Sequence, residues 1–364
     1  MDKTRLTTPS TGRRRLRIGF LPLVDCAPLI VAQELRLFAA QDLEVDLCRE
    51  IGWATVRDKI IFGELDASQA AVGLPYAATY GLGSIACPCV TGLVVSRNGN
   101  GITLSTRLTV LGVSDAAALR RFVRESRRRK KLTLGVVHTF SSHNFLLRQW
   151  LRLGGIDPDR DIRIVVVPPS QMYRNLDAGH LDGFCVGEPW NSVTVQQGGG
   201  VTLAVSTQLQ PGHPDKVLMV RQQFADERSD EHERLIAALL AAAEFCDEMD
   251  NRTQIAGWLA QRRYLNLPLQ TILPSLTGHF DYGGGSSEFI EDMVVFHRGG
   301  VSRPGPAVEN WIRSHLQRMG ELNTEISSET SVLRPDIFDR AQGRAISYAQ
   351  GIEKTPAELR AAAA

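Results

Sequence analysis

Short apolar segments alternate with amphipathic ones over the first two thirds of the chain. β-Strands are predicted at 16–21, 43–47, 66–72, 86–95, 132–137, 162–167 and 181–185. Between them, apolar residues recur three or four positions apart, as on one face of an α-helix, at 28–40, 55–62, 143–153 and 170–178. Strands that alternate with helices in this way predict an α/β protein with parallel sheets.

The last third of the chain has a different pattern. Residues 230–259 are strongly helical and include the alanine-rich run IAALLAAAEF, and a further helix is predicted at 311–319. The glycines of YGGGSS at 282–287 and those at 198–200 predict a loop and a turn. The stretch 321–364 is polar and weakly periodic, so we treat it as a C-terminal extension.

Composition narrows the class of protein. A chain of 364 residues is long enough for about two domains. With 43% hydrophobic and 22% charged residues it has the composition of a globular protein. Lys and Arg number 41 against 40 Asp and Glu, a net charge of +1 that argues against direct nucleic-acid binding. No apolar run is long enough to span a membrane, so we expect no membrane association.

The N-terminal residues and the cysteines both bear on the cellular compartment. The arginines at 13–15 and 17 lead into IGFLPLVD, which is too short and too interrupted for a secretory signal. We therefore expect residues 1–14 to form a flexible tail on a cytoplasmic protein. The six cysteines show no metal-binding spacing, and Cys87 and Cys89 are the only close pair. They are expected to be reduced and mostly buried.

A basic segment lies near the middle of the chain. Residues 116–131 are predicted to be helical, and from Arg120 to Lys131 eight basic residues face a single acid, Glu125. Two interpretations stay open. The segment is either a solvated helix face with its loop, or a contact for an acidic partner or RNA.

Several predicted helices begin directly after a strand, with small or polar residues in the turn. These turns lie at 25–28, 52–55, 73–75, 141–143 and 187–189. In open α/β sheets ligands bind at the carboxyl ends of strands, and helix N-termini there favour anions. The sequence has no P-loop, nucleophile elbow or zinc-protease motif, and its eight histidines show no ligand spacing. We therefore expect an anion-binding protein with no catalytic residue, metal or cofactor.

The chain resembles the nitrate- and bicarbonate-binding proteins of ABC-type anion uptake, the NrtA/CmpA group. The similarity runs over roughly residues 16–220. It is carried, in the family's order, by the segments GFLPLVDCAPLIVAQELRLF, GWATVRDKIIFGELDASQA, RNGNGITLS, RQWLRLGGIDPDRDIRIVVVPPSQM, GFCVGEPW and GHPDK. The resemblance implies a two-lobed, periplasmic-binding-protein-like (type II) clamshell with the ligand between the lobes. The implied lobes are 15–108 with 208–320, and 109–207, followed by the extension 321–364.

The resemblance also implies which residues contact the anion. Trp53 corresponds to the family's tryptophan that lines the ligand, and Asn100 stands where relatives commonly have Gln, one methylene longer. His143 corresponds to the histidine that opens a helix of the second lobe, with Ser142 before it. Lys216 corresponds to the lysine of the family's His-Pro-x-Lys motif, and a lysine at this position is typical of nitrate-type members.

A planar monoanion requires N–H donors, one cation and a flat apolar wall. Lys216 would supply the charge, Asn100 and His143 the donors, and Trp53 the wall. We expect replacement of Trp53 to weaken binding and leave the fold intact. Asp25 and Glu188 would repel an anion, so they are expected behind the site, in helix caps or in hydrogen bonds at the lobe hinge.

Three functional hypotheses follow. The group has a cytoplasmic branch, the NasS-type nitrate/nitrite sensors, which hold an RNA-binding antiterminator (NasT) inactive until the anion binds. The absence of a secretory signal favours such a sensor, with nitrate or nitrite and a NasT-like protein as partners. The alternative is the solute-binding subunit of a nitrate or bicarbonate transporter. An enzyme of the thiamine-pyrimidine synthase type comes last, because it relies on a dense cysteine cluster.

Overall fold

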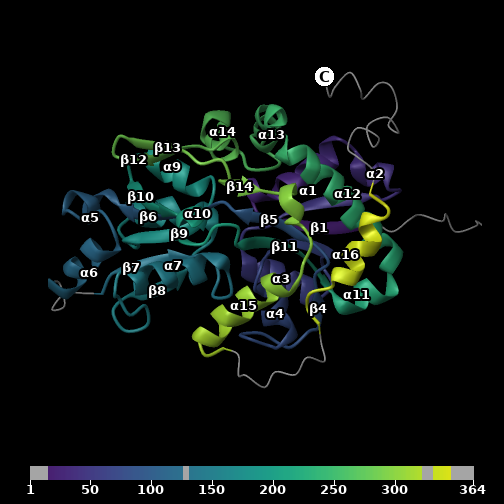
Figure 1. The fold of residues 1–364 in the computed structure, drawn as a ribbon, viewed down its shortest axis with the longest axis horizontal. Coiled ribbons are helices and arrows are strands. Elements are labelled where there is room, and N and C mark those ends of the chain that lie inside the picture. Colours follow the sequence, from purple (N-terminus) through teal and green to yellow (C-terminus); the bar gives the residue numbers. More distant parts are fainter. Residues whose placement is uncertain (1–14, 126–130, 322–330, 346–364) are drawn as a thin grey trace, which may run out of the picture.

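The computed structural model describes residues 15–125, 131–321 and 331–345. The predicted tail 1–14, residues 126–130 of the basic segment, and 322–330 and 346–364 of the predicted extension lie outside the described residues. The described chain forms two α/β units side by side, each built on its own sheet (Figure 1). A small hairpin of β12 (His279–Gly283) and β13 (Ser286–Phe289) packs beside the second unit.

The first sheet combines strands from both halves of the chain. Its order is β14 (Val294–Val295), β5 (Val94–Asn98), β11 (Pro214–Arg221), β3 (Ala67–Ala71), β1 (Leu16–Phe20) and β2 (Val45–Arg49), and β4 (Cys89–Val90) also pairs with β11. β1 is parallel to β2 and β3. β11 is antiparallel to β3, β4 and β5, so a strand that comes late in the chain fills the centre of the sheet.

The second sheet lies entirely within the middle of the chain. Its order is β10 (Gly200–Val205), β6 (Asn100–Ser105), β9 (Gly183–Gly187), β7 (Thr133–Val136) and β8 (Arg163–Val166). β6 belongs to this sheet because it pairs with β9 and β10. The chain therefore passes from the first sheet to the second at Gly99, between β5 and β6, and the lobe boundary after residue 108 stays a prediction.

Helices cover both sheets (Figure 1). Those that pack on one face of the first sheet are α1 (Ala27–Glu34), α2 (Leu37–Ala40), α12 (Ser229–Asp247), α13 (Arg252–Leu259), α14 (Leu269–Thr277) and α16 (Pro335–Gln342). Those on its other face are α3 (Trp53–Ile61), α4 (Leu74–Thr79) and α15 (Pro306–Arg318). The remaining helices are α5 (Thr106–Val110), α6 (Ala116–Glu125), α7 (Ser142–Leu153), α8 (Met172–Asp177), α9 (Trp190–Gln196), α10 (Ser206–Leu209) and α11 (Gln222–Glu227), with 3₁₀ turns η1 (Val24–Cys26), η2 (Pro169–Gln171), η3 (Met249–Asn251) and η4 (Arg298–Gly300).

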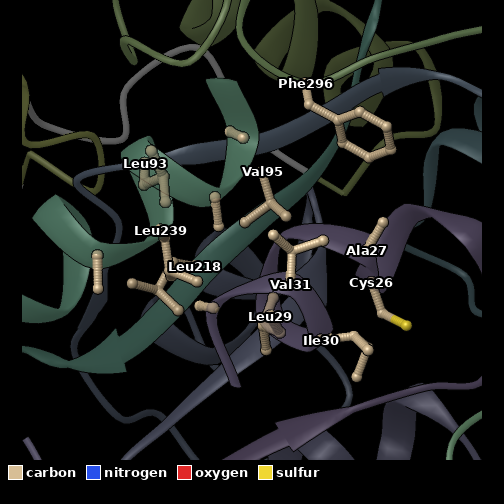
Figure 2. Close-up of a cluster of buried hydrophobic side chains, with 14 of the residues drawn as sticks. Cys26, Ala27, Leu29, Ile30, Val31, Leu93, Val95, Leu218, Leu239 and Phe296 are labelled. Atoms are coloured by element: carbon tan, nitrogen blue, oxygen red, sulfur yellow. The ribbon is translucent and has the colours of Figure 1, made fainter. Parts of the chain in front are cut away.

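The core of the first unit is formed by α1 and α12 against the centre of the sheet (Figure 2). Val31 of α1, Leu239 of α12 and Leu218 of β11 are fully buried in it. The alanine-rich run of α12 is buried too, because small side chains let two helices approach closely.

A second apolar cluster joins the two units. It contains Trp53 of the first unit, Phe145 of the second, and Ile312 and Leu316 of α15, all buried. Because α15 contributes to the same cluster as side chains from both units, it lies where the two units meet (Figure 1).

Two predicted elements differ in detail. The helix predicted at 28–40 is divided into α1 and α2, because Arg36 has a left-handed conformation with φ 53°. The glycines of YGGGSS form the turn of the β12–β13 hairpin, and Gly283, Gly284 and Gly285 all have positive φ, which favours glycine. Both differences come from backbone conformations that hydrophobic periodicity does not report.

All six cysteines are free, with Cys48 and Cys87 partly exposed and the others buried. Among the described residues, no helix combines the length and the apolar character needed to cross a membrane. No group of three or more metal-ligating side chains is assembled there either.

Candidate functional site

The amino group of Lys216 lies at the centre of a buried polar cluster. Lys216 is on β11, in the middle of the first sheet, and its side chain is 0% exposed. Its Nζ atom is 2.8 Å from Oδ2 of Asp25 and also forms an ion pair with Asp215. Burial alone would lower the pKa of Lys216, but the two carboxylates outweigh it and raise the pKa above its ordinary value. The lysine is therefore charged.

The carboxylate of Asp215 connects the two units. Besides Lys216, it accepts hydrogen bonds on Oδ1 from Nδ2 of Asn100, at 3.0 Å, and from the hydroxyl of Ser142. Asn100 opens β6 in the second sheet and Ser142 opens α7, whereas Asp215 lies on β11 of the first sheet. Burial raises the pKa of Asp215 but Lys216 and nearby histidines outweigh it, so the net shift is well below the ordinary value. Asp215 is ionised.

Asp25 holds Lys216 from the other side. Its Oδ1 atom accepts a hydrogen bond from the side-chain amide of Gln69, whose Oε1 accepts one from the backbone N–H of Leu21 at 3.1 Å. Of the two roles expected for Asp25, a helix cap or hydrogen bonds at the lobe hinge, the cap is not formed, because neither η1 nor α1 has a side-chain cap and the carboxylate pairs with Lys216. Two carboxylates thus share one ammonium group in a dry environment.

Trp53 and His143 complete the cluster. Nζ of Lys216 lies 5.5 Å from the ring centre of Trp53, the first residue of α3. His143, the second residue of α7, is fully buried, and burial together with Lys216 lowers its pKa to about 3, so the ring is neutral. Within the described residues, the indole N–H of Trp53 and both ring nitrogens of His143 have no hydrogen-bond partner. The indole N–H of Trp53 and the single N–H of the neutral imidazole are therefore unused donors in this cluster, and the other ring nitrogen is an unused acceptor.

The five residues predicted to contact the anion therefore lie in one cluster. Trp53, Asn100, Ser142, His143 and Lys216 come from both units and are all 0% exposed. We expected Trp53 to line the ligand at the surface of a cleft. In the structure its ring is fully buried and is also part of the apolar cluster between the units. Replacing it will therefore disturb the fold, contrary to our expectation from the sequence.

Sequence reasoning missed Asp215, His213 and Gln69. Nε2 of His213 lies 3.1 Å from Nδ2 of Asn100, and burial lowers its pKa to about 4. The ring of His213 packs 5.7 Å from that of Trp311 on α15. An acid directly before the lysine in HPDK was the available signal for Asp215. Its meaning depends on the tertiary structure, which brings Asn100 of β6 next to it.

Glu188 has a separate role at the junction of the units. It accepts hydrogen bonds from Oγ of Ser192 at 2.6 Å and from Oγ of Ser275 at 3.0 Å, and its backbone oxygen accepts one from the N–H of Val24 at 2.9 Å. The backbone N–H of Ser192, in the first turn of α9, also reaches this carboxylate at 3.3 Å. Burial raises the pKa of Glu188. The residue joins the start of α9 to α14 and to η1.

The charge balance predicts a pH dependence of stability. Burial raises the pKa of Asp25 from 3.8 to about 7, with Asp215 adding to the rise and Lys216 opposing it. Because the folded chain then keeps a proton that the unfolded chain has lost, the free energy of unfolding should fall as the pH rises from about 4 to about 7. We expect Asp25→Asn to lack this component.

Denaturant unfolding of both proteins at about pH 5 and about pH 8 measures it. The free energy of unfolding of the wild type minus that of Asp25→Asn should be smaller at about pH 8 than at about pH 5. The histidines contribute equally to both proteins and cancel in this difference. A difference that stays constant over this range would mean that Asp25 keeps an ordinary pKa.

Comparison with known proteins places the chain in a family. A profile described as the NMT1-like family matches residues 10–260. The chain belongs to this family. Its curated relatives are substrate-binding and transport proteins rather than enzymes.

Two curated relatives show how the similarity is distributed. The chain is 40% identical over 332 residues to the nitrate import ATP-binding protein NrtC of Synechocystis sp., a match that covers 90% of this chain and 49% of NrtC. It is 30% identical over 349 residues to the nitrate/nitrite binding protein NrtA of Synechococcus elongatus, covering 92% of this chain and 79% of NrtA. The chain thus spans about half the length of the ATP-binding relatives.

A solved structure supports the fold. The periplasmic nitrate-binding protein NrtA from Synechocystis PCC 6803 superposes with a TM-score of 0.86 at 27% identity, over 94% of this chain and 91% of that one. The predicted two-lobed, periplasmic-binding-protein-like α/β fold is confirmed.

Proposed function

We propose that the protein binds nitrate or nitrite at the Lys216 cluster. The observation that carries the proposal is one fully buried ammonium group surrounded by hydrogen-bond donors from both units. Relatives that share the fold and the family are named for nitrate or nitrite. A small planar oxyanion is compatible with such donors, and the neutral ring of His143 can donate to it without a change in charge.

We further propose that the protein is a cytoplasmic sensor. The chain is 40% identical to about half of the ATP-binding protein NrtC of Synechocystis sp.. It is 30% identical to the nitrate/nitrite binding protein NrtA of Synechococcus elongatus. Because ATP is an intracellular solute, a unit that forms part of an ATP-binding protein is expected to meet its ligand inside the cell. In this proposal the chain holds a NasT-like, RNA-binding antiterminator and releases it when the anion binds.

Lobe movement would connect ligand to partner. An anion can shift an open–closed equilibrium only by its differential affinity for the two states. Since the donors come from both units, a bound anion stabilises the arrangement in which they meet. A partner that contacts both units would then encounter a different surface.

The predicted extension 321–364 is our candidate for part of the partner contact. Ile337 and Phe338 of α16 are buried in the core of the first unit, and Arg340 pairs with Glu233 of α12 at 2.6 Å. This helix is therefore fastened to the first unit by one face. Only its outer face and the neighbouring chain could meet a partner.

Size-exclusion chromatography with a purified antiterminator of the NasT type tests the sensor proposal. We expect the two proteins to co-elute without anion and to separate in millimolar nitrate or nitrite. Thermal unfolding of the protein alone, with the same salts and with chloride as control, shows whether the anion binds at all, because a ligand of the folded state raises the melting temperature. Stabilisation by nitrate together with co-elution that ignores it would remove the sensor role and keep the binding role.

The second candidate is the solute-binding subunit of a nitrate-type transporter. The superposition on a periplasmic nitrate-binding protein, over more than nine tenths of both chains, favours it. Fractionation of cells that produce the protein from its own gene separates the two candidates. Recovery from the periplasm would support the transporter subunit, and recovery from the cytoplasm would support the sensor.

A further inference from the structure

The side chain of Asp215 receives the hydrogen bonds that an anion would need. Its two oxygens accept from Nδ2 of Asn100 at 3.0 Å, from the hydroxyl of Ser142 and from the ammonium group of Lys216. These three donors come from β6, α7 and β11. Their convergence on one carboxylate requires the two units to be together, as they are in this structure.

The same three donors belong to the proposed ligand site. The ammonium group of Lys216 already points two of its three N–H donors at Asp215 and Asp25. Nδ2 of Asn100 donates to Asp215 and lies 3.1 Å from Nε2 of His213, so few of these donors are left for a second anion while Asp215 is in place. A further negative charge beside Asp215 and Asp25 would also leave three anions around one cation, all of them buried. The ligand and the Asp215 carboxylate therefore compete for the same donors.

We infer that Asp215 is a built-in occupant of the anion site, and that a ligand binds by displacing its carboxylate from Asn100, Ser142 and Lys216. This inference rests on the proposed function for the identity of the ligand. Asp25 has a different part, since it contacts Lys216 and Gln69 but neither Asn100 nor Ser142 in the described structure. It remains as the counter-ion of Lys216 when Asp215 leaves.

The inference specifies the class of ligand. A carboxylate is planar and offers two oxygens along one edge, and nitrate, nitrite and bicarbonate offer a similar edge. Sulfate and phosphate are tetrahedral and bring oxygens out of this plane, so they do not match a fully buried position that a flat carboxylate occupies. Planar oxyanions should therefore replace Asp215, and tetrahedral ones should not.

The inference also gives Asp215 a part in joining the two units. Asp215 links the first sheet to β6 and α7 through its own carboxylate. A ligand exchanges this link for one of its own, so its apparent affinity is reduced by the population in which Asp215 still occupies the donors.

The test compares Asp215→Ala with the wild type by calorimetric titration with sodium nitrate. Removing the competitor is expected to lower the Kd by about tenfold or more. Asp25→Asn is the matched control, because it removes one negative charge from the same lysine and leaves Asn100 and Ser142 engaged. An equal gain in Asp25→Asn would reduce the effect to charge alone and overturn the inference, as would unchanged or weaker nitrate binding by a folded Asp215→Ala.

Sodium formate provides a readout that does not depend on nitrate. Formate is a free carboxylate, so by filling the vacated position it should raise the melting temperature of Asp215→Ala by more than that of the wild type, in which it must first displace Asp215. Sodium sulfate at the same ionic strength should raise neither. If Asp215→Ala does not fold, Asp215→Asn carries the comparison, with a smaller gain expected because the amide still accepts from Ser142.

The outcomes separate this inference from the proposed function. Formate rescue without nitrate binding in any variant would retain the anion position and remove nitrate as the ligand. Nitrate binding by the wild type, with no gain and no formate rescue in either Asp215 variant, would retain the proposed function and refute displacement.

Discussion

Replacing Lys216 by methionine is expected to abolish nitrate binding and to lower the free energy of unfolding by about 3–5 kcal/mol. The change keeps an unbranched side chain that is one heavy atom shorter and removes its charge, which leaves Asp25 and Asp215 buried without a cation. Denaturant unfolding gives the stability, and calorimetric titration gives the affinity. Lys216→Glu would be more severe, because it places a third carboxylate in the same cluster.

A rescue variant separates the two effects of Lys216→Met. Adding Asp25→Asn and Asp215→Asn removes the unpaired charges, so most of the lost stability should return. Nitrate binding should not return, because the cation is still missing. If Lys216→Met binds nitrate with the affinity of the wild type, the anion site lies elsewhere in the molecule.

Trp53→Ala is expected to lower the free energy of unfolding by about 3–5 kcal/mol, because the ring is 0% exposed in the cluster that joins the two units. This loss makes alanine a poor probe of the ligand. Trp53→Phe keeps an aromatic ring beside Lys216 and removes the indole N–H, which has no partner among the described residues.

The phenylalanine variant should remain folded and bind nitrate about tenfold more weakly, if the N–H donates to the anion. Thermal unfolding without ligand provides the control for stability. Equal nitrate affinity in Trp53→Phe and the wild type would show that Trp53 acts through packing and contributes no hydrogen bond.

The electrostatics of the cluster differ from those of a simple cationic pocket. From the sequence, Lys216 was expected to supply an uncompensated positive charge. In the structure Lys216 forms ion pairs with both Asp215 and Asp25. Burial raises the pKa of Asp25 to about 7. Anion binding should therefore be favoured when Asp25 is protonated or when Asp215 has moved away. This connects the predicted pH dependence with the displacement experiment.

Local pattern was enough to predict much of this protein. Strand and helix periodicity identified the α/β class. Short sequence motifs shared with the family identified side chains that the structure brings together, at Trp53, Asn100, His143 and Lys216. Such features depend on residues a few positions apart, or on short segments whose order is visible in the chain. The two lobes followed from the resemblance, and their boundary after residue 108 stays a prediction.

The tertiary structure alone decided how the cluster is charged. Asp25 and Lys216 are separated by about half of the chain, and they meet because β11 pairs with β3 in the centre of the first sheet. Asp215 reaches Asn100 only because β6 belongs to the other unit and the two units lie together. Periodicity reports which face of an element is apolar, but it carries no information about which distant element covers that face. The pairing of two acids with one lysine, and with it the competition between Asp215 and a ligand, is therefore a property of the folded chain.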